Sequence, residues 1–274
     1  MNTDIIICPV CQNRLEVHNT ALKCALEHSF DLSAKGYINL LTDKYKNSLL
    51  PGDNKEMVLA RRRFLQSGAF SPLQNGLADA IKNLSDTLVN VIDAGCGEGT
   101  YASFISEQLP ENVSMYGFDI SKDAIIHAAK KSRHVSWIVA SLFHLPVQTH
   151  SIDCILNVFA PASNEEFDRV LAKDGKLITA IPGKKHLWEL KKVLYDEPYE
   201  NDETFPPLPS FTLVSKMKIS GQIHINNQAD LHDLLAMTPY FWRTPKNGIE
   251  KAKLLNELDS PIEFIIGTFV KNNK

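Results

Sequence analysis

The chain has 274 residues, 22% of them charged, and a formal net charge of −3, so it can bury a full hydrophobic core but carries no global basic field. Contact with nucleic acid would therefore depend on local patches, because nearby lysines and arginines set the attraction for phosphate. No apolar run approaches the roughly 20 residues that cross a bilayer, and we expect neither a membrane segment nor a signal peptide.

Three cysteines and a histidine lie close together near the amino terminus, as Cys8-x-x-Cys11 and, after twelve intervening residues, Cys24-x-x-x-His28. Two turns that each supply two ligands can complete a tetrahedron around Zn²⁺. A redox pair or a set of buried thiols shares the first spacing, but the third cysteine and the histidine favour zinc. Because protein atoms would fill all four positions, we expect one structural zinc ion. His18, outside this spacing, is expected on the surface.

The five cysteines are an odd number, which fits thiols in a reducing cytoplasm better than a disulfide framework. Cys96 and Cys154 are then ordinary buried thiols. The short amino-terminal segment can bury little core of its own, so we expect metal binding to supply much of its folding free energy.

A polar connection over residues 33–50 leads to a predicted helix, for which Asp53 and Glu56 form a capping box and Gly68 marks the end. The helix carries the run Arg61-Arg62-Arg63. Consecutive side chains point around a helix, so only one or two of these arginines can meet the phosphates of one partner.

From residue 89 the sequence alternates apolar strands with helical patterns. This alternation predicts an α/β fold with a mostly parallel sheet, whose ligands lie beyond the carboxyl ends of the strands. The expected strands cover residues 89–94, 113–118, 135–139, 152–158 and 175–181, and the expected helices cover 99–108, 121–131 and 163–172. The tail is expected to add a β-prone stretch over 211–225, helices near 228–237 and 246–257, and a strand near 262–270.

The first of these strands ends in Asp93 and runs into a turn that contains Gly95, Gly97 and Gly99. A dinucleotide fingerprint needs its third glycine at the sixth position of the turn, where this chain has Thr100. That weakens the NAD interpretation and favours S-adenosylmethionine, whose methionine part can approach a glycine backbone and whose carboxylate can meet the first helical amides. Asp93 would then face the ammonium group of the cofactor, directly or through water.

The second strand ends in Asp119, where one carboxylate can accept hydrogen bonds from both hydroxyls of a ribose. Asp93, the glycine turn and Asp119 together resemble class I methyltransferases. Ser141 and Leu142 follow the third strand, where an adenine could lie, although many such enzymes have an acid in place of the serine. Asn157 follows the fourth strand, but the sequence after it is not the Asn-Pro-Pro-aromatic motif of amino-group methyltransferases.

Three aromatic features leave alternatives open. Phe70 is most simply a core residue, although its ring could also pack on the cofactor. His186 begins a helix at the rim of the same cleft, where a site role and a surface or capping role are equally open. Residues 237–243 are rich in aromatic side chains and could stack a splayed base, but packing over the sheet edge is favoured.

Together these motifs resemble the RlmA-type 23S ribosomal RNA (guanine-N1)-methyltransferase family over essentially the whole chain. The matching stretches are Cys8-Pro9-x-Cys11, Cys24, His28-x-Phe30-Asp31, Lys35-Gly36-Tyr37-x-Asn39-Leu40-Leu41, Pro51-Gly52-Asp53, Ala60-Arg61-Arg62-x-Phe64-Leu65, Asp93-x-Gly95-Cys96-Gly97-Glu98-Gly99 and Met237-Thr238-Pro239. The resemblance implies a Rossmann-like class I methyltransferase domain that uses S-adenosylmethionine and carries an amino-terminal zinc ribbon or knuckle.

The resemblance also implies that the zinc module and the cleft grip a hairpin of large-subunit ribosomal RNA, and that the protein acts as a homodimer in the cytoplasm. It maps family cofactor contacts onto Phe70, Gly97, Glu98 and His186, but relatives usually have tyrosine in place of Phe70. The expected zinc ligands are Cys8, Cys11, Cys24 and His28, and the expected cofactor-binding residues are Phe70, Asp93, Gly95, Gly97, Glu98, Gly99, Asp119, Ser141, Leu142, Asn157 and His186.

We therefore expect a zinc-binding module over 1–34, a linker with helices over 35–88, and a methyltransferase domain with a helical insertion over 89–274. The expected reaction is methyl transfer to N1 of a guanine, with no catalytic side chain assigned, since Asn157 is a poor acceptor for the N1 proton. Two alternatives stay open: a quinone- or antibiotic-type small-molecule methyltransferase, and a non-catalytic RNA-binding or ribosome-assembly protein.

Overall fold

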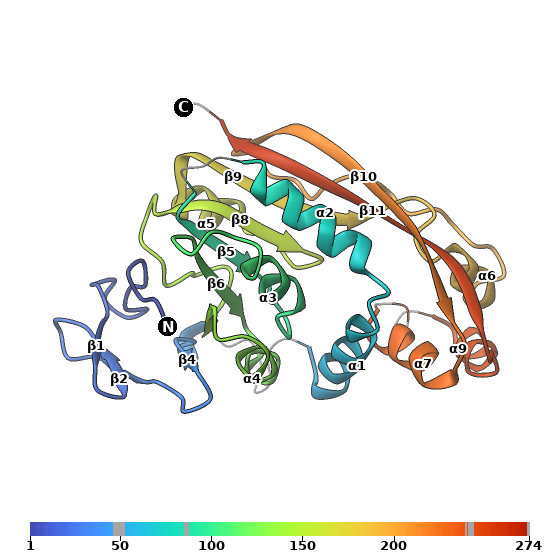
Figure 1. The fold of residues 1–274 in the computed structure, drawn as a ribbon, viewed down its shortest axis with the longest axis horizontal. Coiled ribbons are helices and arrows are strands. Elements are labelled where there is room, and N and C mark those ends of the chain that lie inside the picture. The colour runs from blue at the N-terminus through green and yellow to red at the C-terminus, as the bar shows by residue number, and fades with distance from the viewer. Residues whose placement is uncertain (46–52, 85–87, 239, 241–243, 273–274) are drawn as a thin grey trace.

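The computed structural model describes residues 1–45, 53–84, 88–238, 240 and 244–272. Its centre is an eight-stranded sheet with the order β10-β11-β9-β8-β5-β6-β7-β4 (Figure 1). The strands are β1 (Glu16–His18), β2 (Ala21–Lys23), β3 (Ser29–Asp31), β4 (Tyr37–Asn39), β5 (Asn90–Ala94), β6 (Ser114–Asp119), β7 (Val135–Val139), β8 (Ile152–Val158), β9 (Leu171–Pro182), β10 (Phe211–Ile225) and β11 (Leu258–Lys271). The helices are the 3-10 helix η1 (Asp43–Tyr45), α1 (Lys55–Gln66), α2 (Ser71–Lys82), α3 (Thr100–Ser106), α4 (Lys122–Lys131), α5 (Asn164–Val170), α6 (Trp188–Leu194), α7 (Gln228–Ala236) and α9 (Lys246–Lys253).

Six neighbouring strands of the sheet, from β9 to β4, run parallel. Strands β11 and β10 complete it as an antiparallel pair at the β9 edge. The strands and helices expected from the alternation are all present, so the predicted α/β class is confirmed. The main differences are that β9 begins at Leu171, inside the expected helix 163–172, and that α9 ends at Lys253.

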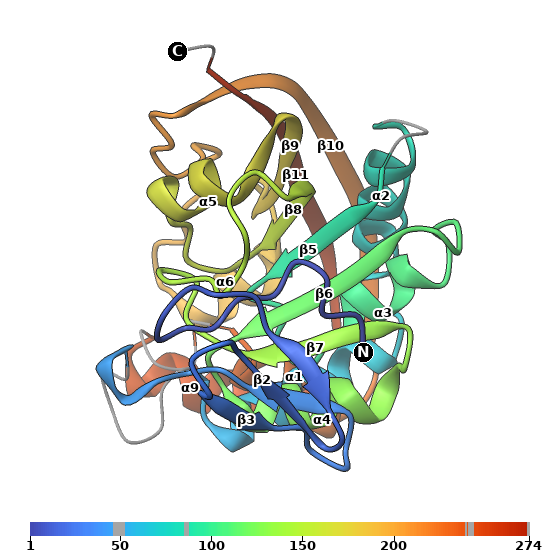
Figure 2. The ribbon, with the colours of Figure 1, turned by 90° about the vertical axis from the view of Figure 1, so that its left-hand side faces the viewer.

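The sheet has an apolar layer on each face, because successive side chains of a strand point to opposite sides. Val91 packs in one layer with side chains from helices α1 to α4. Its neighbour Ile92 packs in the other layer with Ile6, Leu22 and Phe167 of α5. The amino-terminal segment therefore shares the core of the sheet, and burial stabilises it in addition to any metal. Figures 1 and 2 show this segment, in blue, at the β4 end of the sheet.

Strand β4 lies within residues 33–50, which were expected to be only a connection. It pairs in parallel with β7, with Tyr37 opposite Trp137. Three residues are too few to show an alternating pattern, and the pairing partner is far along the chain, so the sequence carries no local signal for this strand. Residues 46–50 of the expected connection lie outside the described residues.

Helix α1 begins one residue later than expected. Its N-cap is Asn54, whose side chain accepts a hydrogen bond from the backbone N–H of Met57 at 2.9 Å. Asp53 was therefore wrongly predicted as the cap, and with it the capping box. The carboxylate of Asp53 instead forms an ion pair with Arg61.

Each of the three consecutive arginines of α1 has a partner within the chain. Arg61 pairs with Asp53, Arg62 contacts His127 at 3.1 Å, and Arg63 donates two hydrogen bonds to Asp233 at 2.6 and 2.5 Å. Because these partners lie on different elements, the run ties α1 to both α4 and α7. A contact with phosphate would have to compete with these partners.

The long antiparallel pair of β10 and β11, called the hairpin below although α7 and α9 lie between its strands in the sequence, reaches past the rest of the sheet. Strand β9 pairs only with Phe264–Val270 of β11, so the end of the hairpin near Leu258 overhangs and carries α6, α7 and α9 (Figure 1). A space lies between these helices on one side and the carboxyl ends of the parallel strands on the other. No helix within the described ranges is long and apolar enough to cross a membrane.

Two glycines with nearly equal backbone angles allow a test of packing in this fold. Gly99 has a φ of +81°, and a Cβ there would lie 2.6 Å from Trp137 Cη2 and 2.8 Å from Ala128 Cβ, whereas Gly68 has a φ of +80° and open space around it. We expect Gly99→Ala to lower the free energy of unfolding by about 2–4 kcal/mol through strain and overpacking, and Gly68→Ala by about 1 kcal/mol through strain alone. Denaturant unfolding measures both, and equal losses would show that packing against Trp137 does not matter.

Candidate functional site

Four donor atoms from the two amino-terminal turns lie within 4.8 Å of one another: the Sγ atoms of Cys8, Cys11 and Cys24 and a ring nitrogen of His28. Cys24 Sγ lies 3.5 Å from Cys11 Sγ and 3.3 Å from His28 Nδ1, and Cys8 Sγ lies 3.7 Å from His28 Nδ1. Donors around a tetrahedral zinc ion with bonds near 2.3 Å are about 3.8 Å apart. The spacing therefore fits one zinc ion, while His18 is exposed as expected.

The glycine turn after β5 is held by the end of the neighbouring strand β6. The carbonyl oxygen of Phe118 accepts hydrogen bonds from the N–H groups of Gly95 and Cys96, at 2.8 and 3.0 Å. Asp119 Oδ2 accepts a third bond, from the N–H of Gly97 at 2.9 Å. The turn is thus fixed at the carboxyl ends of the strands, where ligands of parallel sheets bind.

The loop after β8 packs directly on this turn. A Cβ at Gly95, which has a φ of +89°, would lie 2.3 Å from Ala160 Cβ, so only glycine fits there. Asn157 was expected among the cofactor-binding residues, but its side-chain Nδ2 donates to Ala94 O at 2.8 Å and to Pro161 O at 3.3 Å. Asn157 therefore braces the loop against the end of β5.

Three acids surround the turn, and they differ in their partners. Asp93 is only 1% exposed, and its Oδ2 has no hydrogen-bond partner among the described residues. Burial raises the pKa of Asp93 to about 8, with a further contribution from the charges of Asp119 and Glu98. Asp119 also accepts a bond from the N–H of Ser121 at 2.7 Å, and Glu98 lies 3.3 Å from Lys131. Asp93 is thus the acid that a nearby cation would stabilise most.

A cavity of about 940 Å³ opens beside the glycine turn, between the strand ends and the overhanging helices. This volume is in the range that holds a cofactor-sized ligand. Eight of the eleven residues expected to bind cofactor line it, namely Phe70, Gly95, Gly97, Glu98, Asp119, Ser141, Leu142 and His186. The other three, Asp93, Gly99 and Asn157, do not line it. Gly99 packs against Trp137 instead, so any effect of Gly99 on a cofactor in the cavity would be indirect.

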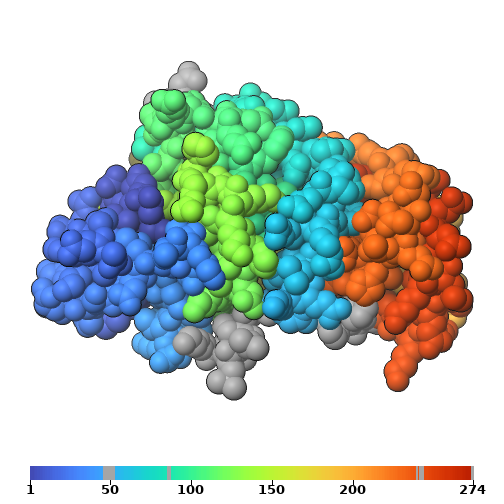
Figure 3. Space-filling view, turned by 60° about the horizontal axis from the view of Figure 1, so that its bottom comes forward, coloured from blue at the N-terminus to red at the C-terminus, as the bar shows by residue number. Residues whose placement is uncertain are grey.

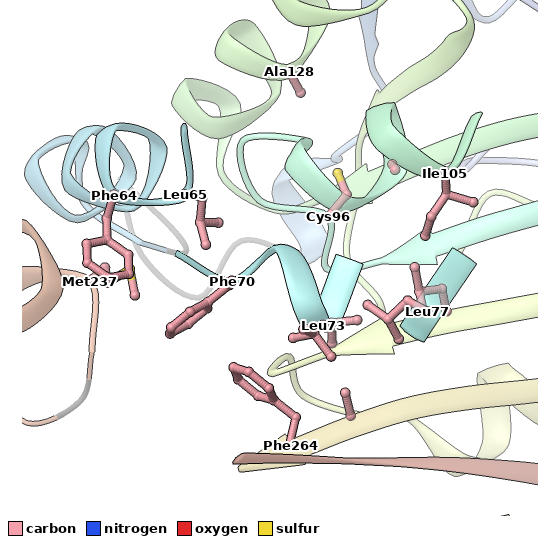
Figure 4. Close-up of a cluster of buried hydrophobic side chains, with 14 of the residues drawn as sticks. Phe64, Leu65, Phe70, Leu73, Leu77, Cys96, Ile105, Ala128, Met237 and Phe264 are labelled. Carbon is pink, nitrogen blue, oxygen red and sulfur yellow. The ribbon is translucent and has the colours of Figure 1, made fainter. Parts of the chain in front are cut away.

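Phe70 and His186 form part of an aromatic cluster at the wall of the cavity. The ring of Phe70 meets Phe64 and Phe264 edge-on, at centroid distances of 5.4 and 5.0 Å (Figure 4), and lies 5.6 Å from His186. His186 Nδ1 accepts a bond from the N–H of Glu263 at 3.3 Å, and burial lowers the pKa of His186 to about 3. His186 is therefore buried and neutral, with Nε2 left for a ligand. Phe70 is both a core residue and a lining residue.

One wall of the cavity was missed by the sequence reasoning. It contains Arg61 of α1, Tyr101 of α3 and a group of tyrosines beyond α6, and it also includes described members of the 237–243 stretch. The residues in question are Arg61, Tyr101, Tyr195, Tyr199, Asn201, Met237, Thr238 and Tyr240. Met237 lies in the apolar core and Tyr240 packs against it, so these two residues both pack, as expected, and line the cavity with Thr238, while Pro239 and residues 241–243 lie outside the described residues.

Comparison with known proteins identifies both parts of the chain. A family model of the RlmA amino-terminal zinc ribbon matches residues 6–49, and a methyltransferase-domain model matches residues 91–177. A solved structure from Anaeromyxobacter dehalogenans, named "Putative Type II Methyltransferase", has the same fold with a TM-score of 0.51 and 18% identity, over 72% of this chain and 95% of that chain. Fold, cavity and zinc ribbon together define a class I S-adenosylmethionine-dependent methyltransferase with a structural zinc site.

Two relatives match nearly the whole chain. A protein of Bacillus subtilis (strain 168), named "Putative 23S rRNA (guanine-N(1)-)-methyltransferase YxjB", is 30% identical over 93% of both chains. The 23S rRNA (guanine(748)-N(1))-methyltransferase of Streptomyces fradiae is 30% identical over 92% of this chain and 90% of its own. The chain belongs to the 23S rRNA (guanine-N1)-methyltransferase family.

The buried acid Asp93 makes the stability of the folded protein depend on pH. Its folded pKa of about 8 lies above the ordinary value of 3.8, so the folded state binds more protons in this window and stability falls as pH rises through it. For one proton this loss is up to about 1.4 kcal/mol in the free energy of unfolding per pH unit. We expect Asp93→Asn, which cannot ionise, to remove this part of the pH dependence. The Tm of the cofactor-free variant relative to wild type should therefore rise from about pH 5 to about pH 9. A difference that does not change with pH would contradict this.

Proposed function

We propose that the protein transfers the methyl group of S-adenosylmethionine to N1 of a guanine in a hairpin loop of 23S ribosomal RNA. The observation that carries this proposal is the single cavity that begins at the glycine turn and continues to Phe159, Tyr195, Tyr199 and Tyr240. Such a cavity has room for a flat base beside the cofactor. The two relatives that match nearly the whole chain are named for this reaction.

The donor half of the cavity suits the cofactor. We assign the methionine part to the turn from Gly95 to Glu98, the ribose to Asp119, and the adenine to Ser141 and Leu142. Asp93 lies behind the turn, and its unpartnered Oδ2 would be compensated by a positive group of the ligand. The remaining expected contacts would act by packing or bracing, as Phe70, Gly99 and Asn157 do, or through Nε2 of His186.

The cofactor supplies an electrophilic methyl group, so the protein has to align the acceptor nitrogen with it and exclude water. Guanine N1 must also lose its proton before its lone pair can attack. The carboxylates of Asp53, Glu98 and Asp119 line the cavity, but each already has a hydrogen-bond or ion-pair partner. His186 is a weak base because its pKa is low. We therefore assign no side chain to this step, and the N1 proton is released to the buffered solvent.

We propose that Cys8, Cys11, Cys24 and His28 bind one structural zinc ion and so form the module over residues 1–34. Residues 35–88 would then link this module to the methyltransferase domain over 89–274. The zinc ion would hold the two turns together, and the apolar layer shared with the sheet would hold the module in place.

We propose that the RNA hairpin lies across the face that joins the module to the cavity, and that two chains form a homodimer around it in the cytoplasm. Figure 3 shows the module, in blue, and helices α7 and α9, in orange to red, at opposite ends of one face. Helix α4 lies between them and carries exposed Lys122 and Lys130. These lysines are local basic groups of the kind that phosphate binding needs in a chain of net negative charge.

The zinc assignment is tested by metal analysis of purified protein. We expect about one zinc ion per chain in wild type and a loss of most of it in Cys24→Ser, because three ligands hold the ion less well than four. Cys154→Ser is the matched control, since this buried thiol belongs to β8 and should leave the zinc content unchanged. Equal zinc content in Cys24→Ser and wild type would refute the ligand set.

The methyl acceptor is tested with labelled S-adenosylmethionine and unmodified 23S ribosomal RNA. We expect label in the RNA and a reverse-transcription stop at one guanine, because a methyl group on N1 blocks Watson–Crick pairing. Gly97→Val should reduce the rate by roughly 100-fold or more, since a side chain there would enter the space near the reacting groups, where small displacements are costly. Label that enters a small molecule of a cell extract, with none in RNA, would favour the small-molecule alternative.

A further inference from the structure

The loop after β8 presents a phenyl ring to the cavity in an unusual backbone conformation. Phe159 has a φ of +52°, is 49% exposed and lines the cavity. The left-handed region is unfavourable for a bulky side chain, and exposure of a large apolar residue to water is unfavourable as well. Residues held in such conformations concentrate at ligand sites, where the surrounding structure enforces them.

The surrounding structure does enforce this conformation. The side chain of Asn157 donates to Ala94 O at the end of β5 and to Pro161 O within the loop, and Ala160 packs on Gly95. The ring of Phe159 meets Phe264 at a centroid distance of 6.0 Å with a tilt of 48°. The loop thus holds the ring beside the turn assigned to the methyl donor.

Three tyrosines of the cavity are engaged differently. Tyr195 lies 5.4 Å from Tyr199 and 6.4 Å from Tyr240, so these rings pack on one another. Lys191 Nζ lies 4.4 Å from the centre of the Tyr199 ring and covers one of its faces. Phe159 therefore combines exposure, strain and a position next to the donor in a way that these tyrosines do not.

We propose that Phe159 is the platform on which the target guanine stacks, an inference that rests on the proposed function. Every base has a flat π face, and stacking on an aromatic ring orients a base while its edge stays free. A guanine held in this way would present its N1 edge toward the donor turn. Phe159 would then contact the substrate and align it, and would take no part in proton transfer.

The test compares three variants with wild type in the RNA methylation assay, together with the dissociation constant of S-adenosylhomocysteine. Phe159→Leu keeps apolar bulk but removes the ring, and we expect kcat/KM for RNA to fall roughly 10- to 100-fold, as at other stacked bases. Phe159→Trp keeps a ring and should retain kcat/KM within about threefold. Both variants should bind S-adenosylhomocysteine as wild type does.

Phe159→Asn separates function from folding. Asparagine adopts a positive φ more readily than phenylalanine, so the Tm should stay the same or rise while kcat/KM falls as in Phe159→Leu. A lower Tm together with lost activity would make the ring structural and overturn the proposal. Unchanged kcat/KM in Phe159→Leu, or an equally large loss of S-adenosylhomocysteine affinity, would overturn it too. If wild type fails to methylate RNA, the proposed function itself fails, and that outcome is distinct from these.

Discussion

The bonds that β6 makes to the turn after β5 are the constraint on which the site depends. Phe118 O and Asp119 Oδ2 accept hydrogen bonds from N–H groups of the turn. These polar groups are therefore satisfied while the backbone of the turn adopts left-handed angles. Gly95 then allows Ala160 to approach, and with it the whole loop after β8. Walls of the cavity that come from distant parts of the sequence are therefore positioned relative to one turn.

The parts of the fold that were predictable from sequence are those with local signals. Alternation and glycine spacing lie within short windows, so they indicated the parallel strands, helices α3 to α5 and the donor end of the cavity. Strand β4 and the tyrosines that line the cavity depend on contacts such as Tyr37 with Trp137 and Tyr195 with Tyr240. These contacts join residues far apart in the sequence, so no local pattern predicts them. The cap of α1 was misassigned because Asp53 and Asn54 are both good caps, and the ion pair with Arg61 engages the first.

The zinc module and the methyltransferase domain are joined more closely than a tethered appendage would be. Ile6 pairs with Val147 and packs in the same apolar layer as Ile92 of the central sheet. The four candidate zinc ligands are therefore attached to the strands that end at the cavity. A disturbance of the metal site would be transmitted to the sheet through this shared packing.

The pairing of β4 with β7 also sets an order of events during synthesis of the chain. The first 45 residues cannot complete their contacts until Val147 has left the ribosome, which takes on the order of ten seconds at typical elongation rates. Until then, Ile6 and Leu22 lack the strands that bury them. The two Cys-containing turns, however, need only residues 8–28 and can capture a metal ion at once. Early metal capture would keep this segment compact, and less prone to aggregate, while the sheet that covers it is still being made.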